Sequence, residues 1–258
     1  MTVPYFGGSS VAYLPLQNTT KNYNSLIASA ASIPAEVALN TTHGPSIHPT
    51  LLAGYRAQLS QHLHLLASSH ATVMELAWTG GNTIPIALLH PLSRGLITIN
   101  STDPLAPPVF DYGTFSHPTD LEIFIASLKK AREWGASAPM QEVGAVEVTP
   151  GAEVASDEDI ARVLREQASG TWSHPAGSLS MLPRGLGGVV DSGLRVYGVR
   201  GVRVVDASIM PILVGSHTSA AVYAVAEKVS FLSFCFPCFP RTGGSAPKRQ
   251  EGDYLSCF

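Results

Sequence analysis

Two long stretches of the chain repeat apolar residues at the three- and four-residue spacing of an amphipathic helix. Residues 51–68 show this spacing in their leucines and a tyrosine, and residues 119–135 show it with Lys and Arg in the last turns. Thr119 and Glu122 have the spacing of a capping box, and Gly135 is a typical helix stop. The pattern therefore predicts a helix over each stretch, the second one beginning at the capping box.

Two shorter helices are predicted from their ends and their composition. Ser156 precedes three acidic residues, which favours a helix start because negative charge is stabilised at that end. Residues 218–231 are rich in alanine and other small residues, so the helix they predict leaves room for another backbone to approach closely.

Short apolar runs between turn residues predict strands. Residues 84–89 form a continuous apolar run typical of a buried strand, and Pro85 indicates that it begins at a sheet edge. Residues 95–100 alternate between apolar and polar. The other segments that we expect to be extended are 11–16, 145–148, 189–190, 194–197 and 202–205. The combination predicts an α+β fold in which an antiparallel sheet is backed by helices.

Composition narrows the functional class. The 258 residues are 45% hydrophobic and 14% charged, which is enough apolar material for a sizeable core. The net charge of −3 and the scattered Lys and Arg argue against nucleic-acid binding. The longest apolar run, 229–239, is too short to span a membrane, and the start of the chain lacks a signal-peptide pattern. Sequons at Asn18, Asn40 and Asn100 are compatible with a secreted parent, so the compartment stays open.

The strongest chemical signal is a pair of histidines in turns rich in Gly, Ser and Pro. His174 lies in Trp172-Ser173-His174-Pro175, and His217 lies between Ser216 and Thr218. Histidine exchanges protons near neutral pH, and turns at the ends of regular elements are where proton-transfer residues are often placed. The alternative is that each ring is bonded to nearby backbone and has only a structural role.

An ordered series of motifs resembles one enzyme family. The match is to the C-terminal half of the glucose–methanol–choline (GMC) FAD oxidoreductases, with the character of fungal aryl-alcohol and glucose oxidase relatives. It covers roughly residues 75–232, and because several separate motifs keep their order, chance is a poor explanation. The motifs are residues 90–95, 117–121, 174–177, 194–199, 204–208 and 217–218.

The family's Gly-x-Gly-x-x-Gly fingerprint for the cofactor pyrophosphate does not occur in this sequence, and Gly185-Leu186-Gly187-Gly188 matches it only in part. The resemblance therefore implies a fragment that lacks the N-terminal FAD-binding half. The expected division is a loop-rich part of the substrate domain (1–74), the substrate-binding domain (75–188), a return to the FAD domain (189–232) and a disordered tail (233–258).

The resemblance implies oxidation of a primary or secondary alcohol to a carbonyl, with hydride transfer to FAD. His174 is then the catalytic base, and His217 is its catalytic partner, which holds the substrate oxygen. Oxygen or a quinone would reoxidise the flavin. The cofactor-binding residues that the resemblance implies are Asp206, Ala207, His217, Thr218 and Ser219.

Three alternatives remain open from the sequence: an inactive fragment, a GMC-like cyclase of secondary metabolism that performs no redox step, and a binding or structural module. Flavin binding, turnover without an electron acceptor, and a stable partner with dispensable histidines would separate them. We expect no metal site, because His62 and His64 diverge on a helix and no third ligand follows at motif spacing. Cys235 and Cys238 imitate a redox motif without its strand–helix setting.

Overall fold

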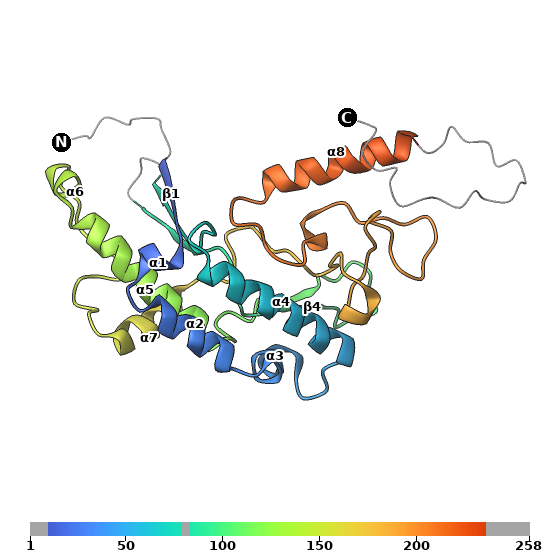
Figure 1. Ribbon diagram of the computed structural model, residues 1–258, viewed down its shortest axis with the longest axis horizontal. Coiled ribbons are helices and arrows are strands. Elements are labelled where there is room, and N and C mark those ends of the chain that lie inside the picture. Colours follow the sequence, from blue (N-terminus) through green and yellow to red (C-terminus); the bar gives the residue numbers. More distant parts are fainter. Residues whose placement is uncertain (1–9, 79–82, 236–258) are drawn as a thin grey trace, which may run out of the picture.

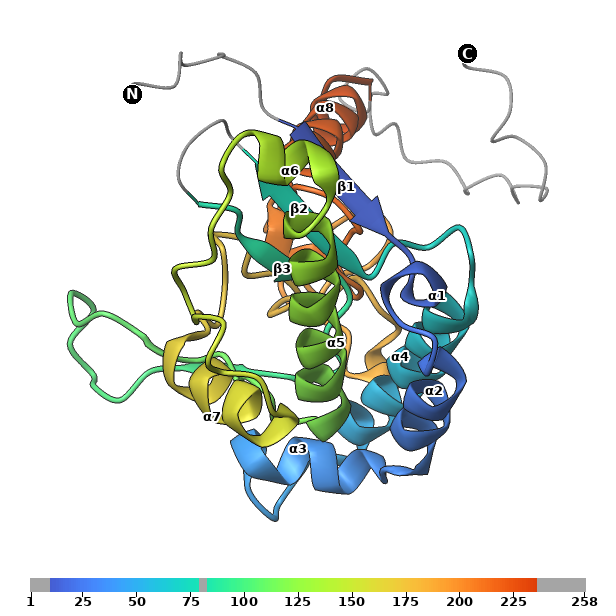
Figure 2. The same ribbon diagram turned by 90° about the vertical axis from the view of Figure 1, so that its left-hand side faces the viewer.

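The computed structural model describes residues 10–78 and 83–235, and these form the α+β fold expected from the sequence. Strands β1 (Ser10–Leu14), β2 (Met74–Trp78) and β3 (Ile86–Leu88) form an antiparallel sheet with β2 in the middle. Strands β4 (Leu96–Thr98) and β5 (Val109–Asp111) form a separate antiparallel pair, and the connection between them projects from the body in Figure 2.

Helices cover the sheet and build the core. Helix α5 packs against β3 and α7, and α4 contacts α2 and α3. Helix α8 lies on the far side of the molecule from α2 and α3 in both views (Figures 1 and 2). The helices are α1 (Leu16–Thr19), α2 (Tyr23–Ser32), α3 (Ala35–His43), α4 (Pro49–Ala67), α5 (Pro118–Gly135), α6 (Ala138–Glu142), α7 (Asp157–Gln167) and α8 (Ser219–Cys235), with short 3₁₀ turns η1 (Arg184–Leu186) and η2 (Ala207–Ile209).

The predicted helices over 51–68, after Ser156 and over 218–231 are confirmed as α4, α7 and α8. The Ser156 hydroxyl accepts from the Asp159 N–H, the cap that the sequence indicated. The strands expected over 11–16, 84–89 and 95–100 also form. β3 is half-buried instead of buried, because it lies at the edge of the described sheet.

The expectation that residues 1–74 are loop-rich is wrong, since α1 to α4 occupy much of this segment. Neither α1, α2 nor α3 has a side-chain cap. They are held instead by the main hydrophobic core, in which Leu16 and Leu39 meet Leu66 of α4 and Ile123 of α5. Tertiary packing therefore stabilises helices whose local start signals are weak.

Helix α5 is confirmed, but its capping box is not. The helix begins at Pro118, and Thr119 is a buried residue inside the first turn. Asp120, which is also buried, accepts hydrogen bonds from the N–H groups of Leu92 and Ser93 at 2.9 and 2.7 Å. This bond across the fold fixes the start of the helix in place of the local capping pattern.

Four of the predicted strands do not form. Residues 145–148 are irregular, and Val146 and Val148 are exposed, because no strand lies beside them in the described chain. The three short segments expected within residues 189–205 pair only through isolated β-bridges, such as Val190 with Val196 and Arg195 with Arg203. The glycine turns leave too few residues between them for a ladder. The tail predicted to be disordered was 233–258, but residues 233–235 instead form the end of α8, and the rest lies outside the described residues.

Arg94 joins α4 to the segment that follows β3. Its guanidinium donates to the Pro91, Leu92 and Ser93 carbonyl oxygens, to Gln58 Oε1 at 3.2 Å and to His62 Nε2 at 2.9 Å. Because arginine can only donate, His62 must accept through Nε2 and is therefore neutral.

His62 makes the stability of the fold depend on pH. Burial, then the charge of Arg94 and then His90, lower the pKa of His62 to about 3. The unfolded chain takes up this proton near pH 6.5, whereas the folded chain does not, so stability falls as the pH drops from about 6.5 toward 3. His117 acts in the same direction, since burial and Arg94 lower its pKa to about 4.

We predict that His62→Gln makes the free energy of unfolding less dependent on pH between 6 and 5, by about 1 kcal/mol per pH unit. Urea unfolding at several pH values measures this slope. His64→Gln, at an exposed position of the same helix, is the matched control and should keep the wild-type slope. Equal slopes in both variants and the wild type would contradict the assignment.

Gly54 allows α4 to approach η1 closely. A Cβ at this position would lie 2.2 Å from the Leu186 carbonyl oxygen, which is backbone and cannot easily move aside. Gly135, at the end of α5, has nothing within 4 Å of the same position.

We predict that Gly54→Ala lowers the free energy of unfolding by about 1–3 kcal/mol, because α4 and the η1 segment must separate. Gly135→Ala should leave it unchanged or raise it by up to ~1 kcal/mol through helix propensity. Thermal unfolding of the two variants tests the contact, and equal melting temperatures would argue against it.

Candidate active site

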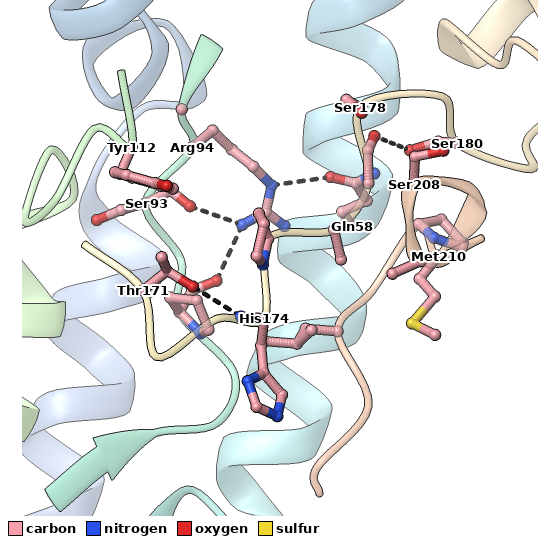
Figure 3. Close-up of a pocket in the computed structure, with 18 of the residues that line it drawn as sticks. Gln58, Ser93, Arg94, Tyr112, Thr171, His174, Ser178, Ser180, Ser208 and Met210 are labelled. Atoms are coloured by element: carbon pink, nitrogen blue, oxygen red, sulfur yellow. Dashed lines mark hydrogen bonds between the residues drawn. The ribbon is translucent and has the colours of Figure 1, made fainter. Parts of the chain in front are cut away.

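A cavity of about 700 Å³ opens between α4, the β2–β3 region, the turn around His174 and the segment that leads to His217. Its volume falls in the range of roughly 300–1,000 Å³ that is usual for small-molecule and cofactor sites. Figure 3 shows His174 on one side of this cavity, with Arg94 and Gln58 joined by a hydrogen bond on another.

The turn that carries His174 is built by local hydrogen bonds and a left-handed residue. Ser173 has φ of +59°, an uncommon conformation for a residue with a side chain, and strain of this kind often occurs at functional sites. The His174 N–H donates to Thr171 Oγ1 at 2.9 Å (Figure 3). His174 Nδ1 contacts the Trp172 carbonyl oxygen, which can only accept, so Nδ1 carries a proton.

The structure brings the two predicted histidines into direct contact. His174 Nε2 lies 3.0 Å from His217 Nδ1, and the ring centroids are 5.0 Å apart. Trp172 packs edge-on against the His217 ring, with centroids 5.6 Å apart. His174 is half-buried and His217 is exposed, and both line the cavity. The pair can therefore reach a ligand in the cavity through the same two nitrogens.

The sequence analysis missed Glu75, which lies behind this pair on β2. Its Oε1 atom is 3.0 Å from His217 Nε2, and the residue is only 2% exposed. The contact does not meet the criteria of a hydrogen bond, and it is an ion pair only when His217 is protonated. A single acid within the apolar strand Met74–Trp78 was the available signal, because buried carboxylates are rare without a partner.

Asp206 and Ala207 line the same cavity. Asp206 Oδ1 accepts from the Ser208 N–H at 2.8 Å and so caps η2. Backbone bonds from Leu179 to Ser208 and from Met181 to Ile209, at 2.9 and 2.8 Å, tie this segment to the chain that follows His174. These bonds hold the segment around Asp206 against the segment that follows His174.

Thr218 and Ser219 do not line the cavity, but they directly follow Ser216 and His217, which do. Thr218 is buried, and its carbonyl accepts from the Val222 N–H as α8 begins. The first N–H groups of a helix have no partner within it and attract negative charge.

Within the described part of the chain, no group of three or more His, Cys, Asp or Glu side chains could hold a metal ion. The same residues include no helix with the length and apolar character needed to cross a membrane. The Cys235–Cys238 motif extends beyond the described residues.

Comparison with known proteins gives a consistent result. The family model described as GMC oxidoreductase matches residues 91–226. The chain is 36% identical to "Dehydrogenase xptC" of Emericella nidulans over 222 residues, which is 85% of this chain and 35% of that protein. The chain spans about a quarter to a third of the length of the curated relatives that it matches.

Two solved structures share the fold. One is an FAD-dependent oxidoreductase from Chaetomium thermophilum, with a TM-score of 0.81 and 33% identity. The other is a fungal aryl-alcohol oxidase, with a TM-score of 0.79 and 36% identity. Each match covers 86% of this chain and 38% of the other.

Proposed function

The chain belongs to the GMC oxidoreductase family, and from this we propose that it is the substrate-binding part of an FAD-dependent alcohol oxidase or dehydrogenase. The observation that carries the proposal is the contact between His174 and His217 on the wall of a ligand-sized cavity. Membership of this family supports the conclusion that the chain is part of an oxidoreductase. The alcohol substrate and the roles of individual residues are our proposal.

The residues around the cavity fit a flavin. The walls combine apolar and polar side chains, and α8 starts beside them at Ser219; the first N–H groups of a helix have no partner within the helix. When bound, FAD supplies the acceptor for the substrate's hydride, which no side chain can provide. The residues proposed to hold it are Asp206, Ala207, His217, Thr218 and Ser219.

His174 is proposed to take the hydroxyl proton of the alcohol. The Trp172 carbonyl keeps a proton on His174 Nδ1, which leaves Nε2 as the atom with a free lone pair. His174 Nε2 faces His217 Nδ1 at 3.0 Å, so a substrate hydroxyl enters between them only when the rings move apart. The hydroxyl then donates to His174 and accepts from His217.

The two hydrogens of the oxidised alcohol leave by different routes. The hydroxyl proton passes to His174 Nε2, and the hydrogen on the carbon leaves with its electron pair as the hydride. His217 holds the oxygen, which becomes the carbonyl oxygen of the product. The proposal covers primary and secondary alcohols, with oxygen or a quinone as the final electron acceptor.

The proposed division of the chain assigns residues 75–188 to substrate binding and residues 189–232 to contact with the FAD-binding part. Packing supports a distinct role for the second segment. Val225 and Val229 of α8 rest on a small core of Val190, Leu194 and Ile209, which is separate from the main core.

We predict that His174→Ala, in a full-length GMC enzyme that carries this chain, slows flavin reduction by the alcohol about 10²–10⁴-fold while FAD stays bound. Anaerobic stopped-flow absorbance measures the reduction, and the flavin spectrum measures retention. His70→Ala, at an exposed position outside the cavity, is the control. Near-normal reduction in the His174 variant would show that the base is another group.

We predict that Asp206→Ala weakens FAD retention, because it removes a polar group from the proposed cofactor side of the cavity. Ser156→Ala is the matched control, since it also removes a helix-capping acceptor but lies outside the cavity. Flavin released on gel filtration is the measurement. Equal retention in the two variants would remove Asp206 from the cofactor site.

A further inference from the structure

The turn that carries His174 is closed by one side-chain hydrogen bond. The Thr171 hydroxyl oxygen accepts from the His174 N–H at 2.9 Å, and the bond spans the residues between them (Figure 3). Ser169 Oγ donates to the Thr171 carbonyl oxygen at 2.7 Å and holds the start of the turn. The backbone N–H of His174 is therefore bound by a side chain of its own turn and not by a neighbouring strand or helix.

The backbone inside this turn is strained. Ser173 has φ of +59°, and a residue with a Cβ atom adopts this left-handed conformation only where surrounding contacts hold it. Pro175 restricts the backbone of His174, because a proline disfavours the helical region for the residue before it. The strained residue is thus enclosed between the hydrogen bond from Thr171 and the restriction from Pro175.

The same stretch of backbone holds the imidazole of His174. The Trp172 carbonyl belongs to the planar peptide unit between Trp172 and Ser173, so its direction relative to His174 depends on φ of Ser173. This carbonyl oxygen contacts His174 Nδ1 and keeps a proton there, because it can only accept. A change in φ of Ser173 would turn the carbonyl away from the ring.

We propose that Thr171 is a positioning residue of the active site: its hydroxyl closes the turn, holds Ser173 in the left-handed conformation and so keeps the proton of the neutral His174 ring on Nδ1. His174 Nε2 then keeps its lone pair on the side that faces His217 Nδ1, 3.0 Å away. The inference rests on the proposed function of His174 as the base. It extends that function because it names the residue that selects which ring nitrogen reacts.

Two substitutions separate the hydroxyl of Thr171 from the shape of its side chain. Thr171→Val keeps the branched shape and loses the hydrogen-bond acceptor, whereas Thr171→Ser keeps the hydroxyl. Thr50→Val is the matched control. The Thr50 hydroxyl also contacts a histidine ring, at 2.8 Å from His48 Nδ1, but neither residue lines the cavity.

The first measurement is ¹⁵N NMR of the histidine rings in this chain without flavin, because nitrogen shifts distinguish protonated from bare ring nitrogens. In the wild-type chain and in Thr171→Ser we expect His174 to carry its proton on Nδ1. In Thr171→Val we expect both tautomers of His174, since the Trp172 carbonyl no longer holds that proton. Thr50→Val should leave the His174 signals unchanged.

A proton on His174 Nε2 with a bare Nδ1 in the wild-type chain would overturn the proposal, and this result needs no variant to fold. A single Nδ1–H tautomer in Thr171→Val would also overturn it, and so would mixed tautomers in Thr171→Ser. Circular dichroism establishes that each variant is folded. If Thr171→Val is not, the wild-type and Thr171→Ser spectra decide.

Activity separates this inference from the function on which it rests. In the full-length enzyme, Thr171→Val should slow flavin reduction at saturating alcohol about 10- to 100-fold, because a small displacement of a catalytic group has an effect of this size. Thr171→Ser should keep most of the wild-type rate. If His174→Ala has no effect, the proposed function fails. If His174→Ala slows reduction and Thr171→Val does not, the function stands and the role of Thr171 is rejected.

Discussion

A carboxylate buried in the middle strand of a sheet is costly without a compensating contact, and in this protein the His217 ring lies against it. The pairing fixes one ring of the site against the sheet. His174 then meets that ring from a turn whose own hydrogen bonds hold its other nitrogen. The candidate active site is therefore a continuous chain of contacts from the core of the fold to the cavity wall.

Other contacts of the fold position the walls of the cavity, and the residues that make them have no proposed role in the reaction. Arg94 ties α4 to the segment after β3 through Gln58 and His62, and Asp120 holds that segment from α5. Gly54 lets η1 approach α4 within backbone contact. These interactions set the distance between the helical half of the molecule and the turns that carry the histidines.

Local sequence signals predicted well wherever the forces act within a few residues. The periodicity of 51–68, the cap at Ser156 and the turn chemistry around His174 all lead to the structure observed. They failed where distant parts of the chain decide. Helices α2 and α3 have no side-chain cap and form because the main core holds them, and the apolar residues at 145–148 find no strand to pair with.

The sequence by itself determined the mixed class of fold, the family resemblance and the two turn histidines. Composition, periodicity and ordered motifs can all be recognised from the order of residues alone. Only the tertiary structure decided that the histidines touch and that Glu75 stands behind them. The role of a buried ionisable side chain depends on the groups that contact it in the folded structure. His217, which contacts Glu75, lies 142 positions further along the chain (217 − 75), and no spacing along the sequence could have identified it.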